Sequence, residues 1–514
     1  MRTGGTWGGR EIGGAKPPIP QMREGEEPER YEALDRIFVR GMWREGRSGK
    51  RKRNVNPWNG EVIGEFPLAD ASDVDEAYAC AAEAWRGWWK LPPQARSEVL
   101  QRAVAIMDAR RDEIMDWLVR DSGGTRAKAE TEWLLGRTVT AEAASMPTRM
   151  QGEILPASVP GKESRVYREP VGVVTVISPF NFPWQLSMRS VAPALACGNA
   201  VVLKPASDTP VTGGTLVAKV FEEAGVPRGV LQVLVGAGSD IGDVIVSHPG
   251  PRVVSFTGSI AVGKHIGEEC GRGVKKASLE LGGNGPFIVL DDADLDRAVD
   301  AAIFGKFFHQ GQICMAINRL LVDRKIHDRF VEKFVARARA LGVGDPDDPK
   351  TIIGPIINTK QRDAILDRVE RTKKAGARAV LEGKVDGLII PPIVLVDVTN
   401  DMPAAREENF GPVAPILAFD GDEEAIRIAN DTNAGLASAV FGGDVERAAE
   451  VGKRIEAGMV HINDAPVNDE ANTAFGGVKD SGLGRFGGKW AMDEFTEWRW
   501  LSVQHAPRGY PTDA

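Results

Sequence analysis

Cysteine and histidine are scarce in this chain of 514 residues, which has four of the first and six of the second. Cys80, Cys197, Cys270 and Cys314 stand far apart, with no Cys-x-x-Cys pair and no histidine cluster. This spacing argues against a disulfide framework and against a zinc site, so we expect reduced thiols and no metal. Taken singly, a free cysteine is more often a small core residue than a nucleophile.

Long apolar runs are also missing. The longest candidate, residues 191–203, is interrupted by Pro193, Gly198 and Asn199 and is too short to span a bilayer. No apolar segment of the signal-peptide kind follows the early positive charges, so we expect a cytoplasmic protein that does not bind membranes.

Charge of one sign is not dominant either. The net charge is -8 and the pI is about 5.6, which are mild values for this length. We therefore expect no nucleic-acid partner and a small-molecule substrate instead. The basic run at residues 50–53 is interpreted as a solvated hairpin segment.

The chain is long enough for two or three domains, and 42% hydrophobic with 26% charged residues indicates large cores. Residues 100–118 show apolar positions at helical spacing and predict one surface helix. Further on, short apolar runs alternate with helical segments, and the pattern restarts after Gly283. We predict an α/β fold with two doubly wound parallel sheets. The predicted strands are residues 171–177, 200–203, 231–235, 253–256, 287–290, 319–322, 438–441 and 459–462.

Two segments carry groups suited to covalent chemistry. Cys314 follows Gly311 and Gln312 and so differs from Cys80 and Cys197, which lie in apolar stretches and fit the interpretation as core residues. Glu280 precedes Gly282 and Gly283 at the junction of the two predicted units, where clefts usually form. A thiolate can attack a carbonyl, and a carboxylate can activate the water that hydrolyses the resulting thioester.

Polar residues also mark the ends of predicted strands, where parallel sheets bind ligands. Asn181 follows one strand and either donates to an oxyanion or caps its turn. Lys204 ends another and either reaches a ribose or phosphate or extends to solvent. Gly258 and Ser259 open a helix whose free N-H groups suit a pyrophosphate. Residues 236–242 are glycine-rich, but their spacing does not match a dinucleotide fingerprint, so they form either a cofactor loop or a tight turn into a helix.

Six segments occur in the order and spacing of one enzyme family. On these segments the chain resembles the NAD(P)-dependent aldehyde dehydrogenase superfamily, from about residue 38 to residue 503. The segments are residues 179–183, 204–207, 256–259, 280–283, 311–314 and 407–412.

The resemblance implies catalytic roles for three residues. Cys314 would be the nucleophile that attacks the aldehyde, the Asn181 amide would hold the oxyanion, and Glu280 would activate the hydrolytic water. The resemblance also implies NAD or NADP as cofactor.

The same resemblance assigns cofactor contacts. Lys204 would contact the adenosine ribose, Glu408 the nicotinamide ribose, and Ser259 beside Gly258 the pyrophosphate, while Phe410 would pack near the nicotinamide. Ser207 stands where many NAD-specific relatives carry a glutamate that repels a 2'-phosphate, so we expect NADP to be tolerated.

Residues 475–488 and 187–190 resemble the branch of benzaldehyde, vanillin and salicylaldehyde dehydrogenases, so an aromatic aldehyde is the expected substrate. Phe182, Trp184, Phe308 and Phe475 would wall an apolar slot for a flat ring. Arg189 would meet a phenolic or carboxylate substituent, or be solvated or paired like most surface arginines.

Other functions stay open at this stage. Aromatic walls are also found in pockets for other aldehydes, which leaves an aliphatic aldehyde or semialdehyde as a substrate. A CoA-acylating relative generally lacks the base at Glu280, and a non-catalytic protein would not need the reactive set. Several relatives have a lysine at Ser190 and an acid at Phe486 that pass a proton from the base, and neither group is present here.

The predicted organisation assigns the segments as follows. Residues 1–30 form a flexible segment, 31–149 and 170–280 the NAD(P)-binding domain, 281–483 the catalytic domain, and 150–169 with 484–514 an oligomerisation arm and tail. The strand-forming tail at residues 497–503 would close an internal sheet or extend the sheet of a neighbouring subunit. The resemblance favours the second alternative, so we expect a homodimer or homotetramer.

Overall fold

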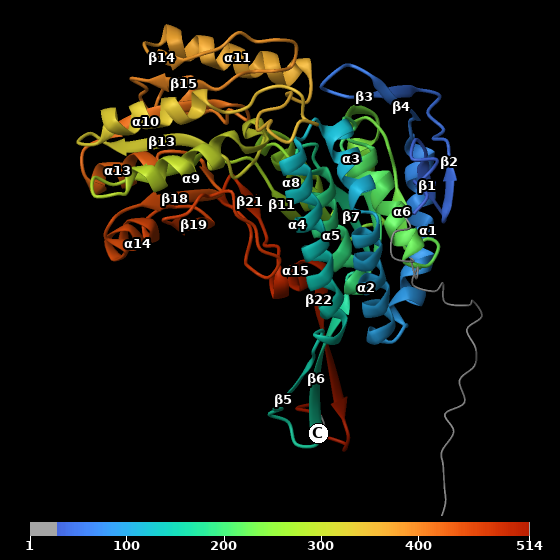
Figure 1. Ribbon diagram of the computed structural model, residues 1–514. Helices are drawn as coiled ribbons and strands as arrows, with labels where there is room; N and C mark the ends of the chain where they lie inside the picture. Colours follow the sequence, from blue (N-terminus) through green and yellow to red (C-terminus); the bar gives the residue numbers. More distant parts are fainter. Residues whose placement is uncertain (1–27, 513–514) are drawn as a thin grey trace, which may run out of the picture.

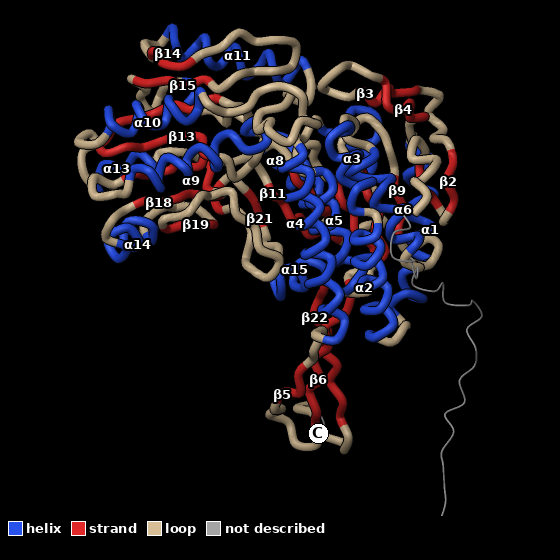
Figure 2. Tube along the Cα trace, viewed as in Figure 1, coloured by secondary structure: helices blue, strands red, loops and turns tan. Residues whose placement is uncertain are grey.

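The computed structural model describes residues 28–512, and most of the segment predicted to be flexible, residues 1–30, lies outside this range. Two large sheets covered by helices form the body, and a narrow three-stranded arm projects from it (Figures 1 and 2). This arrangement agrees with the predicted α/β class. No helix within the described residues is long and apolar enough to cross a membrane.

The first sheet has five central parallel strands, with antiparallel strands at both edges. In spatial order its strands are β2 (Met42–Arg44), β1 (Ile37–Val39), β9 (Leu231–Val233), β8 (Ala200–Lys204), β7 (Val173–Ile177), β10 (Val253–Thr257), β11 (Lys276–Glu280) and β21 (Gly482–Leu483). Its helices are α1 (Ala71–Trp89), α2 (Pro93–Ala109), α3 (Arg111–Ser122), α4 (Arg126–Ser145), α5 (Pro183–Ala196), α6 (Leu216–Glu223), α7 (Asp243–Ser247), α8 (Ile260–Arg272) and α15 (Gly488–Phe495).

The second sheet is parallel except for one edge strand. Its order is β14 (Arg378–Leu381), β15 (Ile393–Val396), β16 (Val413–Phe419), β13 (Ile317–Asp323), β12 (Gly285–Val289), β18 (Ala437–Phe441) and β19 (Met459–Ile462). Its helices are α9 (Leu295–Phe307), α10 (His327–Arg339), α11 (Thr359–Lys374), α12 (Pro403–Arg406), α13 (Asp422–Asn430) and α14 (Val445–Lys453). Two small sheets pair β3 (Arg51–Val55) with β4 (Val62–Pro67) and β17 (Ala434–Gly435) with β20 (Val478–Lys479).

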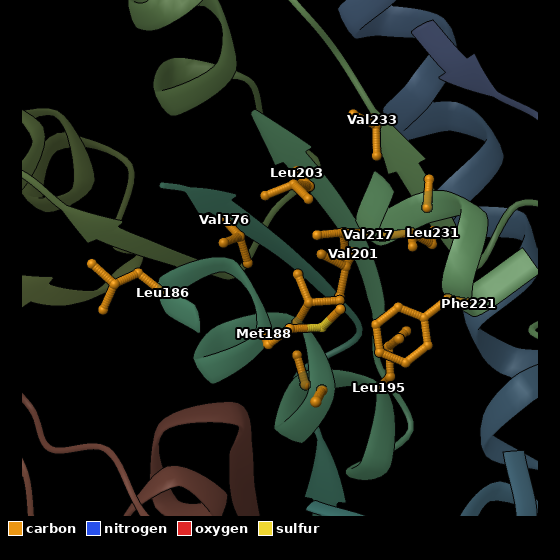
Figure 3. Packing of buried hydrophobic residues seen from close by; sticks show 14 of the residues in the cluster. Val176, Leu186, Met188, Leu195, Val201, Leu203, Val217, Phe221, Leu231 and Val233 are labelled. Atoms are coloured by element: carbon orange, nitrogen blue, oxygen red, sulfur yellow. The ribbon is translucent and has the colours of Figure 1, made fainter. Parts of the chain in front are cut away.

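The core of the first unit lies between its central strands and the helices that cover them. All five residues of β8 are buried, as expected for a parallel strand packed on both faces. Leu203 on β8, Met188 on α5 and Phe221 on α6 lie in the same packed cluster (Figure 3). Burying a side chain of this size contributes about 1.5–3 kcal/mol to folding stability. The strand ends that carry the polar residues are therefore anchored in a well-packed core.

The single surface helix predicted for residues 100–118 is wrong, because the structure has two helices there. α2 ends before Arg110, whose φ of -108° and ψ of 21° leave the helical region, and α3 starts after it. The Arg110 guanidinium pairs with Glu113 at 2.9 Å and with Glu223 at 2.9 Å. Glu113 is therefore buried, although it lies within the predicted surface helix. Helical spacing continues across the break because the turn between the helices is short.

The arm is an antiparallel sheet of β5 (Glu153–Leu155), β6 (Lys162–Pro170) and β22 (Thr496–Gln504). β22 pairs with β6 along its whole length, from Thr496 opposite Pro170 to Gln504 opposite Lys162. The tail thus closes a sheet within its own chain. Apolar side chains of the arm face outward nevertheless, and Ile154 is 75% and Trp500 64% exposed.

Gly482 and Leu483 belong to the first sheet and not, as predicted, to the catalytic segment. They fall inside the predicted catalytic segment, residues 281–483, yet they form the edge strand β21 beside β11 of the first sheet. The other domain boundaries stay predictions.

Candidate active site

A strained loop places Cys314. After α9, the 3-10 turn η4 (Phe308–Gly311) contains His309, Gln310 and Gly311 with φ values of 49°, 56° and 73°. At Gly311 an added Cβ would lie 2.4 Å from the carbonyl oxygen of Gly411, so only glycine fits. The loop is held by Gln310, whose Nε2 donates to the carbonyl of Pro355 at 2.8 Å. Cys314 is therefore held in place by backbone geometry.

Asn181 lies directly beside this loop. It follows β7, and its Nδ2 donates to the backbone carbonyl of Gln312 at 3.0 Å. The fully buried ion pair of Lys128 and Glu132 on α4 supports the segment that follows Asn181. Glu132 Oε1 accepts the N-H of Trp184 at 2.8 Å and so caps the start of α5. The Asn181 amide thus has a fixed position next to the thiol.

Glu280 ends β11 and is buried, with only 3% of its surface exposed. Neither carboxylate oxygen has a hydrogen-bond donor among residues 28–512. Burial raises the pKa of Glu280 to about 8, although the nearby guanidinium groups of Arg189 and Arg485 oppose the rise. A carboxyl group tuned in this way is suited to accept a proton near neutral pH.

Burial also raises the pKa of the Cys314 thiol, to about 12, and the Arg189 guanidinium opposes this rise. Glu280 and Glu408 raise it further through their negative charge. The same cation therefore acts on both the thiol and the carboxyl group. A neutral thiol beside an uncharged acid is the expected resting state at neutral pH.

Two cavities meet at Asn181 and Cys314, the two residues that line both of them. One, the apolar cavity, has a volume of about 160 Å³ and is bounded mainly by side chains of α4, α5, the Cys314 loop and residues 467–475. The other, the strand-end cavity, has a volume of about 410 Å³ and lies at the carboxyl ends of β7, β10 and β11. The thiol can therefore react with one molecule while a second lies beside it.

Four of the predicted cofactor residues line the strand-end cavity, namely Gly258, Ser259, Glu408 and Phe410. Ser259 is the N-cap residue of α8, so the free N-H groups of that helix face the cavity rim. Glu408 is half-buried at the cavity wall, its desolvation raises its pKa to about 7, and its Oε1 accepts the N-H of Gly283 at 3.0 Å. The cavity thus offers anion-binding amides at one end and a carboxylate acceptor at the other.

Lys204 and Ser207 do not line this cavity, although their neighbour Ala206 does. Burial lowers the pKa of Lys204 to about 8, and its Nζ donates to the carbonyl of Pro205 at 3.3 Å. Lys52 reaches the same place, because its Nζ donates to Ser207 Oγ at 2.9 Å and to Asp208 Oδ1 at 2.7 Å. The basic run does lie in a hairpin, but the sequence interpretation missed this contact of Lys52.

The predicted substrate residues Phe182, Arg189, Phe308 and Phe475 line the apolar cavity. Trp184 does not. It is fully buried, and a Cβ on Gly136 would meet its Nε1 at 2.4 Å, so its ring packs against α4 instead. On α5 a step of one or two residues turns a side chain to another face.

Some residues at the site gave no signal in the sequence. Asp469 and Gln185 line the apolar cavity, and Arg368 lines the strand-end cavity. Each stands in a segment without a recognisable motif.

Ser190 and Phe486 stand where several relatives carry a lysine and an acid. The Ser190 hydroxyl forms a hydrogen bond with the Ser255 hydroxyl at 3.0 Å, and Phe486 is buried in the core. Among residues 28–512, no group of three or more His, Cys, Asp or Glu side chains is placed to hold a metal.

Comparison with known proteins gives consistent matches. The profile of the aldehyde dehydrogenase family matches residues 43–501. A vanillin dehydrogenase of Corynebacterium glutamicum is 50% identical over 91% of this chain and 97% of its own length. A benzaldehyde dehydrogenase of Bacillus subtilis is 50% identical over 94% of this chain and 99% of its own length.

Solved structures agree with these sequence matches. An NAD-dependent benzaldehyde dehydrogenase of Corynebacterium glutamicum superposes with a TM-score of 0.85 at 47% identity, covering 92% of this chain and 98% of the other. A salicylaldehyde dehydrogenase of Pseudomonas putida, complexed with salicylaldehyde, gives a TM-score of 0.90 at 37% identity, covering 93% and 99%. Because the family profile matches most of its length and two relatives are 50% identical to it, the chain belongs to the aldehyde dehydrogenase family.

Proposed function

We propose that this protein oxidises an aromatic aldehyde to the carboxylic acid with NAD or NADP. The observation that carries the proposal is the meeting of two cavities at Cys314 and Asn181. The apolar cavity suits a flat ring because Phe182, Phe308 and Phe475 line it. The relatives named above act on vanillin, benzaldehyde and salicylaldehyde, which supports the same substrate class.

The strand-end cavity fits a dinucleotide. It combines the start of α8 at Ser259 with the half-buried carboxylate of Glu408, and a pyrophosphate and a ribose hydroxyl need these two kinds of partner. When bound there, the nicotinamide would supply the acceptor for the hydride. Ser207 carries no negative charge, and the Lys52 ammonium lies beside it while also pairing with Asp208, which supports the use of NADP as well as NAD.

The residues around the thiol have separate tasks in this proposal. Cys314 attacks the aldehyde carbon once its proton has left, and the Asn181 amide, fixed beside the loop, donates to the oxygen that becomes negative. After oxidation the acyl group remains on Cys314 as a thioester. Glu280, whose carboxylate oxygens have no protein donor within the described residues, takes a proton from the water that hydrolyses the thioester.

A spectrophotometric panel at 340 nm tests the proposal directly. Aromatic and aliphatic aldehydes are compared with NAD and NADP in parallel, and Cys314→Ala serves as the control. We expect benzaldehyde-like substrates to give the highest kcat/KM, and the variant to lose at least about a thousandfold in rate, or roughly 4 kcal/mol. Higher kcat/KM for short aliphatic aldehydes would contradict the aromatic assignment, and an active variant would contradict the nucleophile.

We also propose that the arm joins this chain to a second copy of itself in a homodimer or homotetramer. Its outward apolar side chains, including Ile154, Trp498 and Trp500, form a surface that a neighbouring subunit would cover. Light scattering at micromolar concentration is expected to give at least twice the chain mass of 55.5 kDa. A mass of one chain would refute the assignment.

A further inference from the structure

A cation and a carboxylate lie on the wall of the apolar cavity without bonding to each other. Arg189 comes from α5, and Asp469 comes from the loop that follows β19. The two side chains come close enough for Arg189 to lower the pKa of Asp469, while burial raises it. Within residues 28–512, Arg189 and Asp469 nevertheless form no ion pair with each other, so direct contact does not neutralise the charge of Arg189.

Arg189 is the more unusual of the two groups. Only 4% of its surface is exposed, and its guanidinium lies over the rings of Phe475 at 4.3 Å and Phe486 at 4.8 Å. Within residues 28–512, none of its three side-chain nitrogens has a hydrogen-bond acceptor. Because a buried guanidinium without acceptors is costly, this group is suited to an acceptor supplied by a molecule in the cavity.

Asp469 presents the opposite requirement. Its Oδ2 accepts one hydrogen bond, from Nε2 of the buried Gln185 at 2.8 Å. Gln185 also lines the apolar cavity and fixes the direction of the carboxylate from α5. A carboxylate has room for several donors, so the remaining capacity of Asp469 suits a donor in the same cavity. The wall therefore offers donors and an acceptor that are close in space but not joined.

We propose that Arg189 and Asp469 together recognise a hydroxyl group on the ring of the aldehyde. Such a hydroxyl accepts a hydrogen bond from the Arg189 guanidinium and donates one to the Asp469 carboxylate. A methoxy group only accepts, and an unsubstituted ring does neither. The inference rests on the proposed function, because it requires an aromatic aldehyde with its carbonyl at Cys314. It narrows the substrate class to phenolic aldehydes.

The first experiment needs only the unmodified enzyme. For the ortho, meta and para isomers of hydroxybenzaldehyde, kcat/KM is compared with that for the matching methoxybenzaldehyde, because each pair differs in donor capacity. We expect the hydroxyl form to be preferred by about tenfold or more at one ring position, since one hydrogen bond to a charged group has this value. The absence of a hydroxyl preference at every position would overturn the inference.

The second experiment assigns the preference to the carboxylate. Asp469→Ala is expected to reduce the hydroxyl-over-methoxy ratio to within about twofold, because one bond worth about a factor of ten is lost. Glu470→Ala is the matched control, since this exposed neighbour does not line the apolar cavity and the ratio should stay. An equal fall in kcat for hydroxyl and methoxy substrates would overturn the inference and indicate a role in proton transfer.

Two further readouts separate the possible failures. If the unmodified enzyme oxidises no aromatic aldehyde at all, the proposed function fails, whereas oxidation without hydroxyl selectivity contradicts only the present inference. If Asp469→Ala does not fold, as judged by its Tm, Gln185→Ala replaces it. That variant leaves the carboxylate in place without its orienting bond, and a hydroxyl ratio unchanged from the unmodified enzyme would contradict the inference.

Discussion

The raised pKa of Glu280 predicts a steep pH dependence for the hydrolytic half of the reaction. With a pKa of about 8, roughly one tenth of the carboxyl groups are ionised at pH 7 and about nine tenths at pH 9. Thioester hydrolysis should therefore accelerate about ninefold between these two pH values. With the ordinary pKa of 4.5, the same carboxyl group would give a flat profile over this range.

The assay follows the acyl-enzyme itself, so slow binding or hydride transfer does not mask the step. The enzyme is mixed with a substoichiometric aromatic aldehyde and excess cofactor, quenched at intervals and analysed by intact-protein mass spectrometry. Decay of the acyl mass should accelerate through pH 8 in the unmodified enzyme. In Glu280→Gln the acyl mass should persist, without the inflection near pH 8. A flat decay rate from pH 6.5 to pH 9 in the unmodified enzyme would refute the reasoning.

The same shift has a consequence for stability, and its sign is opposite to that of a salt-bridged carboxylate. Because the folded pKa of Glu280 is above its unfolded value, the folded state holds the proton longer. The contribution to stability is present below about pH 4.5 and is lost as pH rises through about 8. The Tm of Glu280→Gln relative to the unmodified protein should therefore increase over this window.

Three further substitutions test other parts of the site. Gly311→Ala should lower the Tm and the rate of Cys314 alkylation, because the added Cβ would lie 2.4 Å from the backbone oxygen of Gly411. The control is Gly387→Ala, which has a φ of 56° and no atom within 4 Å and therefore carries only the conformational cost of about 1 kcal/mol. Equal effects of the two substitutions on alkylation would contradict the assigned contact. Lys52→Met should raise the KM for NADP about tenfold more than that for NAD, since a charge-assisted bond near Ser207 is lost; unchanged selectivity would remove Lys52 from cofactor recognition. Glu132→Ala should destabilise the fold by about 3–5 kcal/mol, measured by urea denaturation, because it leaves a buried lysine unpaired; a loss below about 1 kcal/mol would contradict the importance of this ion pair for stability.

The sequence located the reactive set because each member sits at the end of a recognisable strand or in a motif. Asn181 and Lys204 follow apolar runs that predict strands, and parallel strands bring such ends to one edge of a sheet. Glu280 was located by the two glycines that follow it, because its own strand β11, with the sequence Lys-Ala-Ser-Leu-Glu, has no apolar run.

Other features depended on packing that no local pattern encodes. Trp184 has the same apolar character as Phe182, and only the rotation of α5 decides which ring faces the cavity. Asp469 reaches the site through a loop without regular structure, so its distance from Arg189 cannot be deduced from spacing. Lys52 belongs to a charged run, and such runs are usually exposed, so its contact with Ser207 has no local signal. In each case a contact between distant segments outweighed the local pattern.

The edge strand β21 has a consequence for the order of folding. Gly482 pairs with Glu280, and the N-H of Leu281 donates to the carbonyl of Ser481 at 2.9 Å, across some two hundred residues of sequence. The backbone around Glu280 therefore obtains its outer partner only after the whole second unit has been synthesised. Contacts of such long range form slowly because a large loop must close first. The nascent chain can thus assemble most of the first sheet early, yet it becomes a competent catalyst only when the segment around Gly482 has left the ribosome and paired with β11.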